Sequence, residues 1–211
     1  MSGKTTIYIV RHGQTAWNVE HRFQGHQDSP LTELGTKQAE WLGESLRNER
    51  IDTIFSSSSP RARKTAELIR GARDLDIMES GALMEIHLGI WEGLTQTEVK
   101  QLYPEQLDYF WNDPGQFRVP GSETFQEVSR RAVDQLHRII GENEDKSILI
   151  VTHTVVVKLL MAHFEDRPLN RIWNPPYIHP ACLCKVEIGM NQPEIILHGD
   201  ISHYKEAGSE D

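Results

Sequence analysis

The stretch Ile7-Tyr8-Ile9-Val10-Arg11-His12-Gly13 sets an arginine and a histidine directly behind an unbroken apolar run. A run of this kind is typical of a strand that is buried on both faces, as the strands of parallel sheets are. Open α/β folds place their active sites at the carboxyl ends of such strands. The stretch therefore predicts an α/β protein in which Arg11 and His12 lie at the functional edge of the sheet.

Two further strand ends carry residues of the same kinds. The run Ser147-Ile148-Leu149-Ile150-Val151 ends in Thr152-His153-Thr154, where a helical pattern begins. A third strand is predicted over Asp52-Thr53-Ile54-Phe55, and in the helix that follows, Pro60 suits the first turn, which also holds Arg61. Because a parallel sheet gathers the carboxyl ends of its strands, we expect the two histidines and the two arginines to meet at one edge.

Two arginines and two histidines in one place favour a phosphate site. A guanidinium stays charged and its planar fork matches phosphate oxygens, so Arg11 and Arg61 would form a phosphate clamp. The imidazoles of His12 and His153 are either metal ligands or include a nucleophile that forms a phosphohistidine. Metal is the weaker alternative, because the arginines repel a cation and the local motifs bring no close carboxylate. We therefore expect no metal and no cofactor.

The order of the motifs resembles that of the histidine phosphatase superfamily, also called phosphoglycerate mutase-like. The resemblance extends over about residues 5 to 160, and it implies a three-layer α/β/α sandwich with a mostly parallel central sheet and an antiparallel edge strand. The motifs that carry it are Arg11-His12-Gly13-Gln14-Thr15-Ala16-Trp17-Asn18, Phe23-Gln24-Gly25, Ser59-Pro60-Arg61-Ala62, Met84-Glu85, Gly89-Ile90-Trp91-Glu92-Gly93 and Pro120-Gly121-Ser122-Glu123-Thr124.

The resemblance also implies a role for each site residue. The implied roles are nucleophile for His12, holders of the transferring phosphoryl group for Arg11, Arg61 and His153, proton donor and then activator of water for Glu85, and lining of the phosphate pocket for Asn18 and Gln24.

The role of Glu85 meets a chemical need, since an alkoxide is a poor leaving group unless it is protonated. The nearby arginines are expected to favour the ionised form of its carboxyl, which predicts the highest activity on the acidic side of neutrality. Glu92 and Glu123 are by default polar turn residues, with assistance to Glu85 as the alternative.

One position departs from the family pattern, because the second histidine is followed by Thr154, where the family usually has glycine. Glycine lets the backbone approach a phosphate closely, whereas threonine adds a β-branch and a hydroxyl. The backbone N–H remains in either case. We therefore expect Thr154 to be a tolerated variant whose amide still faces the substrate phosphate.

The composition is that of a soluble globular protein, with 211 residues, 38% hydrophobic and 25% charged. No apolar stretch is long enough for a membrane span and no secretory leader is evident, so a cytoplasmic location is expected. The net charge of −9 argues against nucleic acid or an anionic membrane as a partner. The two cysteines, Cys182 and Cys184, are expected to be inert packing residues.

The chain is predicted to be a single domain over residues 1–211, since no linker, repeat or low-complexity tract divides it. Residues 193–198 are predicted to form the last edge strand. Residues 95–119 are expected to be a helical insertion near the active site, or simply an insertion that packs aromatic side chains on the sheet rim. The polar tail over residues 203–211 is expected to be flexible.

Three functions are compatible with these residues. The favoured function is hydrolysis of small phosphomonoesters through a phosphohistidine, with broad specificity, because the stretch from Leu159 to Pro176 resembles the broad-specificity phosphatase branch of the family. The alternatives are phosphoglycerate mutase-type transfer and a phosphate-binding module with weak catalysis. The alcohol part of the substrate and the oligomeric state are left open.

Overall fold

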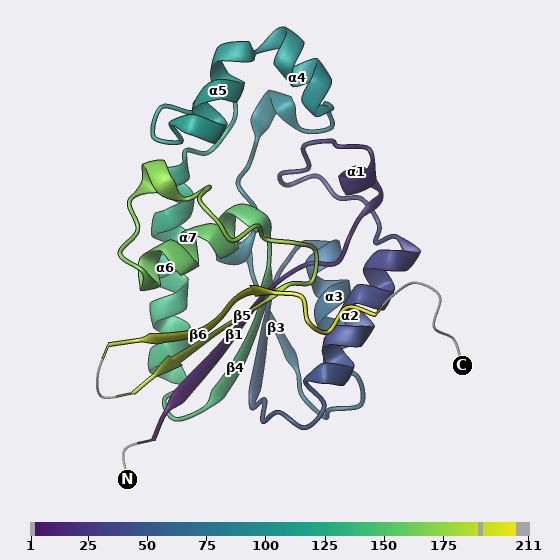
Figure 1. Cartoon of the computed structure of the whole chain (residues 1–211), viewed down its shortest axis with the longest axis vertical. Helices are drawn as coiled ribbons and strands as arrows, with labels where there is room; N and C mark the ends of the chain where they lie inside the picture. Colours follow the sequence, from purple (N-terminus) through teal and green to yellow (C-terminus); the bar gives the residue numbers. More distant parts are fainter. Residues whose placement is uncertain (1–2, 190–191, 206–211) are drawn as a thin grey trace.

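The computed structural model describes residues 3–189 and 192–205, and its centre is a six-stranded sheet in the order β3-β2-β4-β1-β5-β6 (Figure 1). The four strands from β3 to β1 run parallel, whereas β5 is antiparallel to both β1 and β6. The predicted fold class is confirmed, with the antiparallel pairing at the β5–β6 edge. The strands are β1 (Thr5–Arg11), β2 (Thr53–Ser57), β3 (Ile77–Ser80), β4 (Ser147–Thr152), β5 (Leu183–Ile188) and β6 (Glu194–Asp200).

Alternating side chains of β1 explain the three layers. Ile7 and Ile9 point into a hydrophobic cluster with α6 (Phe125–Glu142) and α7 (Thr154–Phe164). Tyr8 and Val10 point the other way, into a cluster with α2 (Glu33–Ser45) and α3 (Pro60–Arg70). Figure 1 accordingly shows α6 and α7 on one side of the sheet and α2 and α3 on the other. The apolar run that opened the sequence is therefore buried on both faces, as predicted.

The helices begin where the sequence provides caps. The Thr32 hydroxyl accepts the amide hydrogen of Gly35 at the start of α2. A capping box between Thr124 and Glu127 starts α6, and Pro60 occupies the first position of α3. These starts fix the ends of the helices that face the carboxyl edge of the sheet.

Short helices lie above that edge. Figure 1 shows α1, α4 and α5 there, and α4 and α5 both lie within residues 95–119. The insertion both packs and covers, because Phe117 is fully buried against Trp91 while Phe110 and Trp111 line a cavity. The short helices are α1 (Ala16–Val19), α4 (Gln96–Leu102), α5 (Pro104–Asn112), and the 3₁₀ turns η1 (Gly81–Leu83), η2 (Gly89–Trp91) and η3 (Leu169–Arg171).

The prediction of a flexible tail from residue 203 is wrong for its first residues. His203 is buried, and the ring of Tyr204 packs near that of Trp41 with 6.2 Å between centroids. The Tyr204 hydroxyl donates to the carbonyl of Pro180. The local sequence does not predict these contacts, because they are made with segments that are distant along the chain. Residues 206–211 of the predicted tail lie outside the described residues.

Cys182 and Cys184 are both buried and free, in agreement with their predicted packing role. Among the described residues, none of the helices has the length and apolar character needed to cross a membrane.

Candidate active site

The carboxyl ends of β1, β2 and β4 bring the predicted residues together. Arg11 ends β1 and His12 follows it, His153 follows β4 as the N-cap of α7, and Arg61 lies in the first turn of α3 behind β2. The ring centroids of His12 and His153 are 5.2 Å apart. A cavity of about 750 Å³ opens over this edge and is lined by Arg11, His12, Arg61 and Glu85, whereas His153 is fully buried and is not among the lining residues.

The hydrogen bonds of His12 determine which of its nitrogens is free. Nδ1 lies 2.7 Å from the carbonyl oxygen of Gly13, and because a carbonyl only accepts, Nδ1 carries the hydrogen. Nε2 is then unprotonated and accepts a long hydrogen bond of 3.4 Å from Nε of Arg61. Burial, followed by the charges of Arg61 and Arg11, lowers the pKa of His12 well below its ordinary value. The imidazole is therefore neutral, with a lone pair on Nε2.

The guanidinium of Arg61 is 2% exposed and is fixed by the loop that follows α1. Its terminal nitrogens donate to the carbonyls of Gly25 and Gln27, each at 2.8 Å, and to the carboxylate of Asp28 at 2.9 Å. The loop thus holds the cation in a fixed orientation beside His12, which is what a preorganised anion site requires.

In the described residues, Arg11 and His153 each have one nitrogen that makes a hydrogen bond within the protein and another that makes none. Arg11 donates from one terminal nitrogen to the carbonyl of Ile178 at 2.7 Å, and His153 Nε2 lies 2.8 Å from the hydroxyl of Ser57. Within residues 3–189 and 192–205, Nε of Arg11 and Nδ1 of His153 are buried without a hydrogen-bond partner. Burial, then the charges of Arg61, His12 and Arg11, lowers the pKa of His153. Arg11 lines the cavity, so its Nε is suited to bind an anion there, whereas the ring of His153 is buried next to that of His12.

The carboxylate of Glu85 sits at the amino end of α7. It accepts the amide hydrogens of Val155 at 3.2 Å and Ile86 at 3.0 Å. Desolvation in the cavity raises the pKa of Glu85, and this effect exceeds the opposing effects of the two amides and of Arg61. The arginines do favour the ionised form, as expected, but loss of solvent acts more strongly than they do, so the pKa of Glu85 is raised overall.

The three predicted substrate contacts also line the cavity. Gln24 donates from its amide to the Thr15 hydroxyl at 2.8 Å, which leaves its amide oxygen buried and without a partner among the described residues. The side chain of Asn18 accepts the Thr15 amide hydrogen and caps α1. Thr154 is the first residue of α7, so its backbone is helical and does not demand glycine.

Sequence reasoning missed Lys158, which lines the cavity and is 5% exposed. Its ammonium donates to the carbonyls of Asn174 and Pro176, both at 2.7 Å, and so holds the loop that forms the outer wall. The available signal was a lysine inside the apolar run Val155-Val156-Val157-Lys158-Leu159-Leu160.

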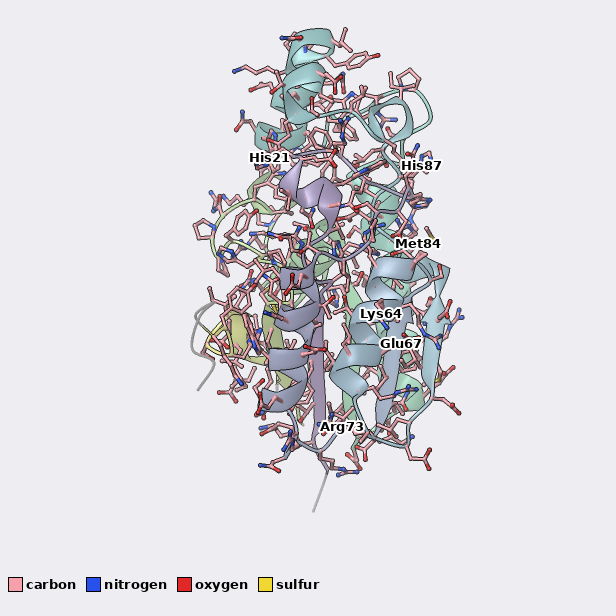
Figure 2. All side chains as sticks on the ribbon, turned by 90° about the vertical axis from the view of Figure 1, so that its right-hand side faces the viewer. His21, Lys64, Glu67, Arg73, Met84 and His87 are labelled. Atoms are coloured by element: carbon pink, nitrogen blue, oxygen red, sulfur yellow. The ribbon has the colours of Figure 1, made fainter. Side chains whose placement is uncertain are left out.

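Charged residues close to Arg61 in sequence lie outside the site. Lys64 is exposed and its ammonium is 3.8 Å from the carboxylate of Glu67. Figure 2 shows both residues on α3, well below His21 and His87. Within the part of the chain that the structure describes, no three His, Cys, Asp or Glu side chains gather as a possible metal site.

Comparison with known proteins agrees with this geometry. Residues 7–201 match the family model of the histidine phosphatase superfamily (branch 1). The chain is 30% identical over 168 residues to phosphoserine phosphatase 1 of Hydrogenobacter thermophilus, covering 80% of each protein. It is 36% identical to a probable phosphoglycerate mutase GpmB of Salmonella choleraesuis, covering 77% of this chain and 75% of that protein.

A solved structure is similar over nearly the whole chain. The structure of YhfR from Bacillus stearothermophilus shares 43% identity with a TM-score of 0.91, and the match covers 94% of this chain and 98% of that one. The enzyme class predicted from the sequence, a phosphatase, is the class named by the family model and by the phosphatase relatives. The chain belongs to the histidine phosphatase superfamily.

Proposed function

We propose that this protein hydrolyses small phosphomonoesters through a phosphohistidine formed on Nε2 of His12. The observation that carries the proposal is the orientation of this imidazole. Its Nδ1–H is held by the Gly13 carbonyl, and its unprotonated Nε2 accepts only a long hydrogen bond, from Nε of Arg61 at 3.4 Å. A neutral imidazole fixed in this way is a nucleophile.

In the first step, Nε2 of His12 forms a bond to phosphorus while the bond from phosphorus to the ester oxygen breaks. The phosphoryl group spreads negative charge over its equatorial oxygens in this transition state. Arg11, Arg61 and His153 hold those oxygens. This assignment is supported by Nε of Arg11 and Nδ1 of His153, which are buried and have no hydrogen-bond partner in the described part of the chain. Fixed donors stabilise the developing charge without having to reorient.

Glu85 supplies the proton that the departing oxygen takes up. Its raised pKa keeps the carboxyl protonated closer to neutrality than an ordinary glutamate. In the second step, Glu85 as carboxylate accepts a proton from water, whose oxygen attacks phosphorus as the bond from phosphorus to nitrogen breaks. The products are inorganic phosphate and the alcohol, and Glu85 is protonated again.

The outer part of the cavity accommodates the alcohol. Aromatic side chains line the cavity together with polar ones, and aromatic surface accepts substrates of different shapes by apolar contact. We therefore propose broad specificity, with Asn18, Gln24 and Thr154 contacting the phosphate. The aromatic residues of the wall are Phe23, Phe110, Trp111, Trp173 and Tyr177.

Names of similar proteins include both phosphatases and a probable phosphoglycerate mutase, so transfer between hydroxyls is the second candidate function. The two functions differ in how long the phosphohistidine avoids water. We expect inorganic phosphate to be released from a panel of phosphomonoesters in the presence of excess chelator, because the arginines neutralise the phosphate without a cation. With 3-phosphoglycerate, phosphate release is expected to exceed formation of 2-phosphoglycerate.

Each arm of this experiment has a result that contradicts the proposal. Isomerisation faster than hydrolysis would assign the protein to the mutases. Activity that chelator removes and one divalent ion restores would establish a metal requirement. Binding of phosphate esters without turnover would leave only a phosphate-binding module.

Thr154→Gly is expected to change kcat/KM by less than about tenfold. The reason is that the backbone N–H at the start of α7 is present in both proteins. The matched variant Thr154→Val keeps the β-branch and removes only the hydroxyl. A loss well above tenfold in both variants, measured by phosphate release, would show that the hydroxyl itself contacts the substrate.

We further propose that the 211 residues form one catalytic domain that works in the cytoplasm on small molecules and not on nucleic acid or membranes. The match over residues 7–201 and the packing of both hydrophobic clusters on one sheet support the single domain. The two free thiols are typical of a reducing compartment, and the net charge of −9 disfavours polyanionic partners.

A further inference from the structure

The segment that carries Glu85 is held by one side chain of α6. Arg131 donates to the carbonyls of Ala82 at 2.9 Å and Met84 at 2.7 Å from one terminal nitrogen, and to the carbonyl of Glu85 at 3.0 Å from the other. These carbonyls belong to η1 and the turn after it. The carbonyl of Leu83, within the same segment, accepts the hydroxyl hydrogen of Thr152 at 2.7 Å. Because Arg131 holds three carbonyls up to Glu85 itself, the backbone position of Glu85 depends in large part on this guanidinium.

Arg131 is in turn held by Glu123, from the Pro120–Thr124 motif to which the proposed mechanism gives no role. The pair is bidentate, with Nε and a terminal nitrogen of Arg131 each 2.7 Å from a carboxylate oxygen. One of these oxygens also accepts the amide hydrogen of His87 at 2.9 Å. The Arg131–Glu123 pair thus anchors the chain on both sides of Glu85. Figure 2 labels Met84, which precedes Glu85, and His87, which lies two residues after it, one above the other.

The donors of Arg131 are fully used in this arrangement. Its guanidinium has five N–H groups, and they make five hydrogen bonds, three to backbone carbonyls and two to Glu123. Burial alone would raise the pKa of Glu123, but Arg131 and the His87 amide together hold it below its ordinary value, so the partner stays charged. A lysine cannot reproduce a planar set of five bonds.

Neither member of the pair lines the cavity, so neither contacts a substrate there. The carbonyl of Glu85 has a second donor, Nε2 of His26 at 2.9 Å. His26 donates to one of the three carbonyls, and its Nε2 also lies 3.8 Å from the carboxylate of Glu123, whereas Arg131 donates to all three carbonyls. Loss of Arg131 is therefore expected to make the position of the Glu85 carboxyl less well defined, while the carboxyl itself stays in the site.

We propose that Arg131, locked by Glu123, is a positioning residue that aims the carboxyl of Glu85 at the oxygen of the leaving group. This inference rests on the proposed role of Glu85 as the acid. A misplacement of about 1 Å at a catalytic group costs about 10²-fold in rate. The loss of rate is expected for substrates whose leaving group must take up a proton. The phosphate clamp of Arg11, Arg61 and His153 is left intact.

The test measures kcat and KM of Arg131→Lys and Glu123→Gln on two substrates, glycerol phosphate with a poor leaving group and p-nitrophenyl phosphate with a good one. We expect kcat for glycerol phosphate to fall about 10²-fold, and kcat for p-nitrophenyl phosphate to fall less than about threefold. KM should change little with either substrate. Arg138→Lys, on the exposed side of the same helix, is the matched control and should resemble the wild type.

A double-variant comparison separates positioning from general support of the fold. In a Glu85→Gln background, Arg131→Lys should cause no further loss with glycerol phosphate, because the group it positions no longer donates a proton. Losses that multiply, or equal losses on both substrates, would overturn the proposal. The thermal midpoint shows whether Arg131→Lys is folded. If it is unfolded, Glu123→Gln supplies the same test, because it keeps one oxygen acceptor for Arg131.

The outcomes also distinguish this inference from the proposed function. A wild-type protein that releases no phosphate, or a Glu85→Gln variant that loses equally on both substrates, would overturn the acid role and this inference with it. A leaving-group-dependent loss in Glu85→Gln that Arg131→Lys does not share would overturn the inference alone.

Discussion

Replacement of His12 by alanine is expected to lower kcat for phosphomonoester hydrolysis by at least about 10⁴-fold, since the proposed covalent intermediate forms on this residue. The remaining clamp of Arg11, Arg61 and His153 should still bind phosphate. The measurement is steady-state phosphate release together with trapping of a phosphoenzyme from labelled substrate. Wild type should give an acid-labile, base-stable adduct, as a phosphohistidine does, and His12→Ala should give none.

The control for this variant is His137→Ala, which removes an exposed histidine of α6 outside the cavity. It should retain wild-type activity, and both variants should keep the far-ultraviolet circular dichroism of the wild type. A phosphoserine or an aspartyl phosphate in the trapped enzyme would contradict the mechanism, as would substantial turnover by His12→Ala.

Glu85→Gln is expected to lower kcat with an alkyl phosphate by about 10²- to 10⁴-fold, the range of general acid catalysis. The loss with p-nitrophenyl phosphate should be less than about tenfold, because a nitrophenolate leaves with little protonation. Both rates are measured by phosphate release at one pH. Equal losses on the two substrates would remove Glu85 from the acid role.

The pH dependence of kcat/KM provides a second readout of the same residue. His12 must be neutral to attack, so the rate falls when the pH drops through its lowered pKa. Glu85 must be protonated to donate, so the rate falls when the pH rises through its raised pKa. An ordinary carboxyl titrates below an ordinary imidazole, which would leave few molecules with both groups in the working form.

The lowered pKa of His12 and the raised pKa of Glu85 move the two values toward each other. They therefore increase the fraction of molecules in which His12 is neutral and Glu85 is protonated. We expect a bell-shaped profile with its maximum on the acidic side of neutrality for the alkyl phosphate. In Glu85→Gln the descending limb should be lost from the residual rate with the alkyl phosphate. A limb that persists unchanged in this variant would mean that another group controls it.

The grouping of His12, His153 and Arg61 was predictable because they lie at or just after the ends of apolar strand runs. A parallel sheet sends such ends to one edge whatever the loops do, so His12, His153 and Arg61 were placed together from local patterns alone. The neighbouring motifs then indicated Glu85 by resemblance. No tertiary contact had to be known for any of these positions.

The supports of the site were not predictable in this way. Arg131 is one of several charged residues on an amphipathic helix, and only the folded chain brings it to the carbonyls of Ala82, Met84 and Glu85. The state of Glu85 was predicted from its charged neighbours, whereas desolvation, which depends on the whole cavity, sets the direction of its pKa shift. His203 was assigned to a flexible tail because its burial depends on distant residues.

The position of β1 in the sheet has a consequence for how the site forms during synthesis. β1 is made first, yet its neighbours are β4, residues 147–152, and β5, residues 183–188. Both edges of the first strand therefore stay unpaired until most of the chain has left the ribosome, and closing such long loops is slow. Over that interval the nascent chain presents an apolar strand with open edges to other chains. His12 and His153 meet only when β4 docks, so catalytic activity in a pulse-labelled refolding experiment should emerge late, together with protection of the β1 amides from hydrogen exchange.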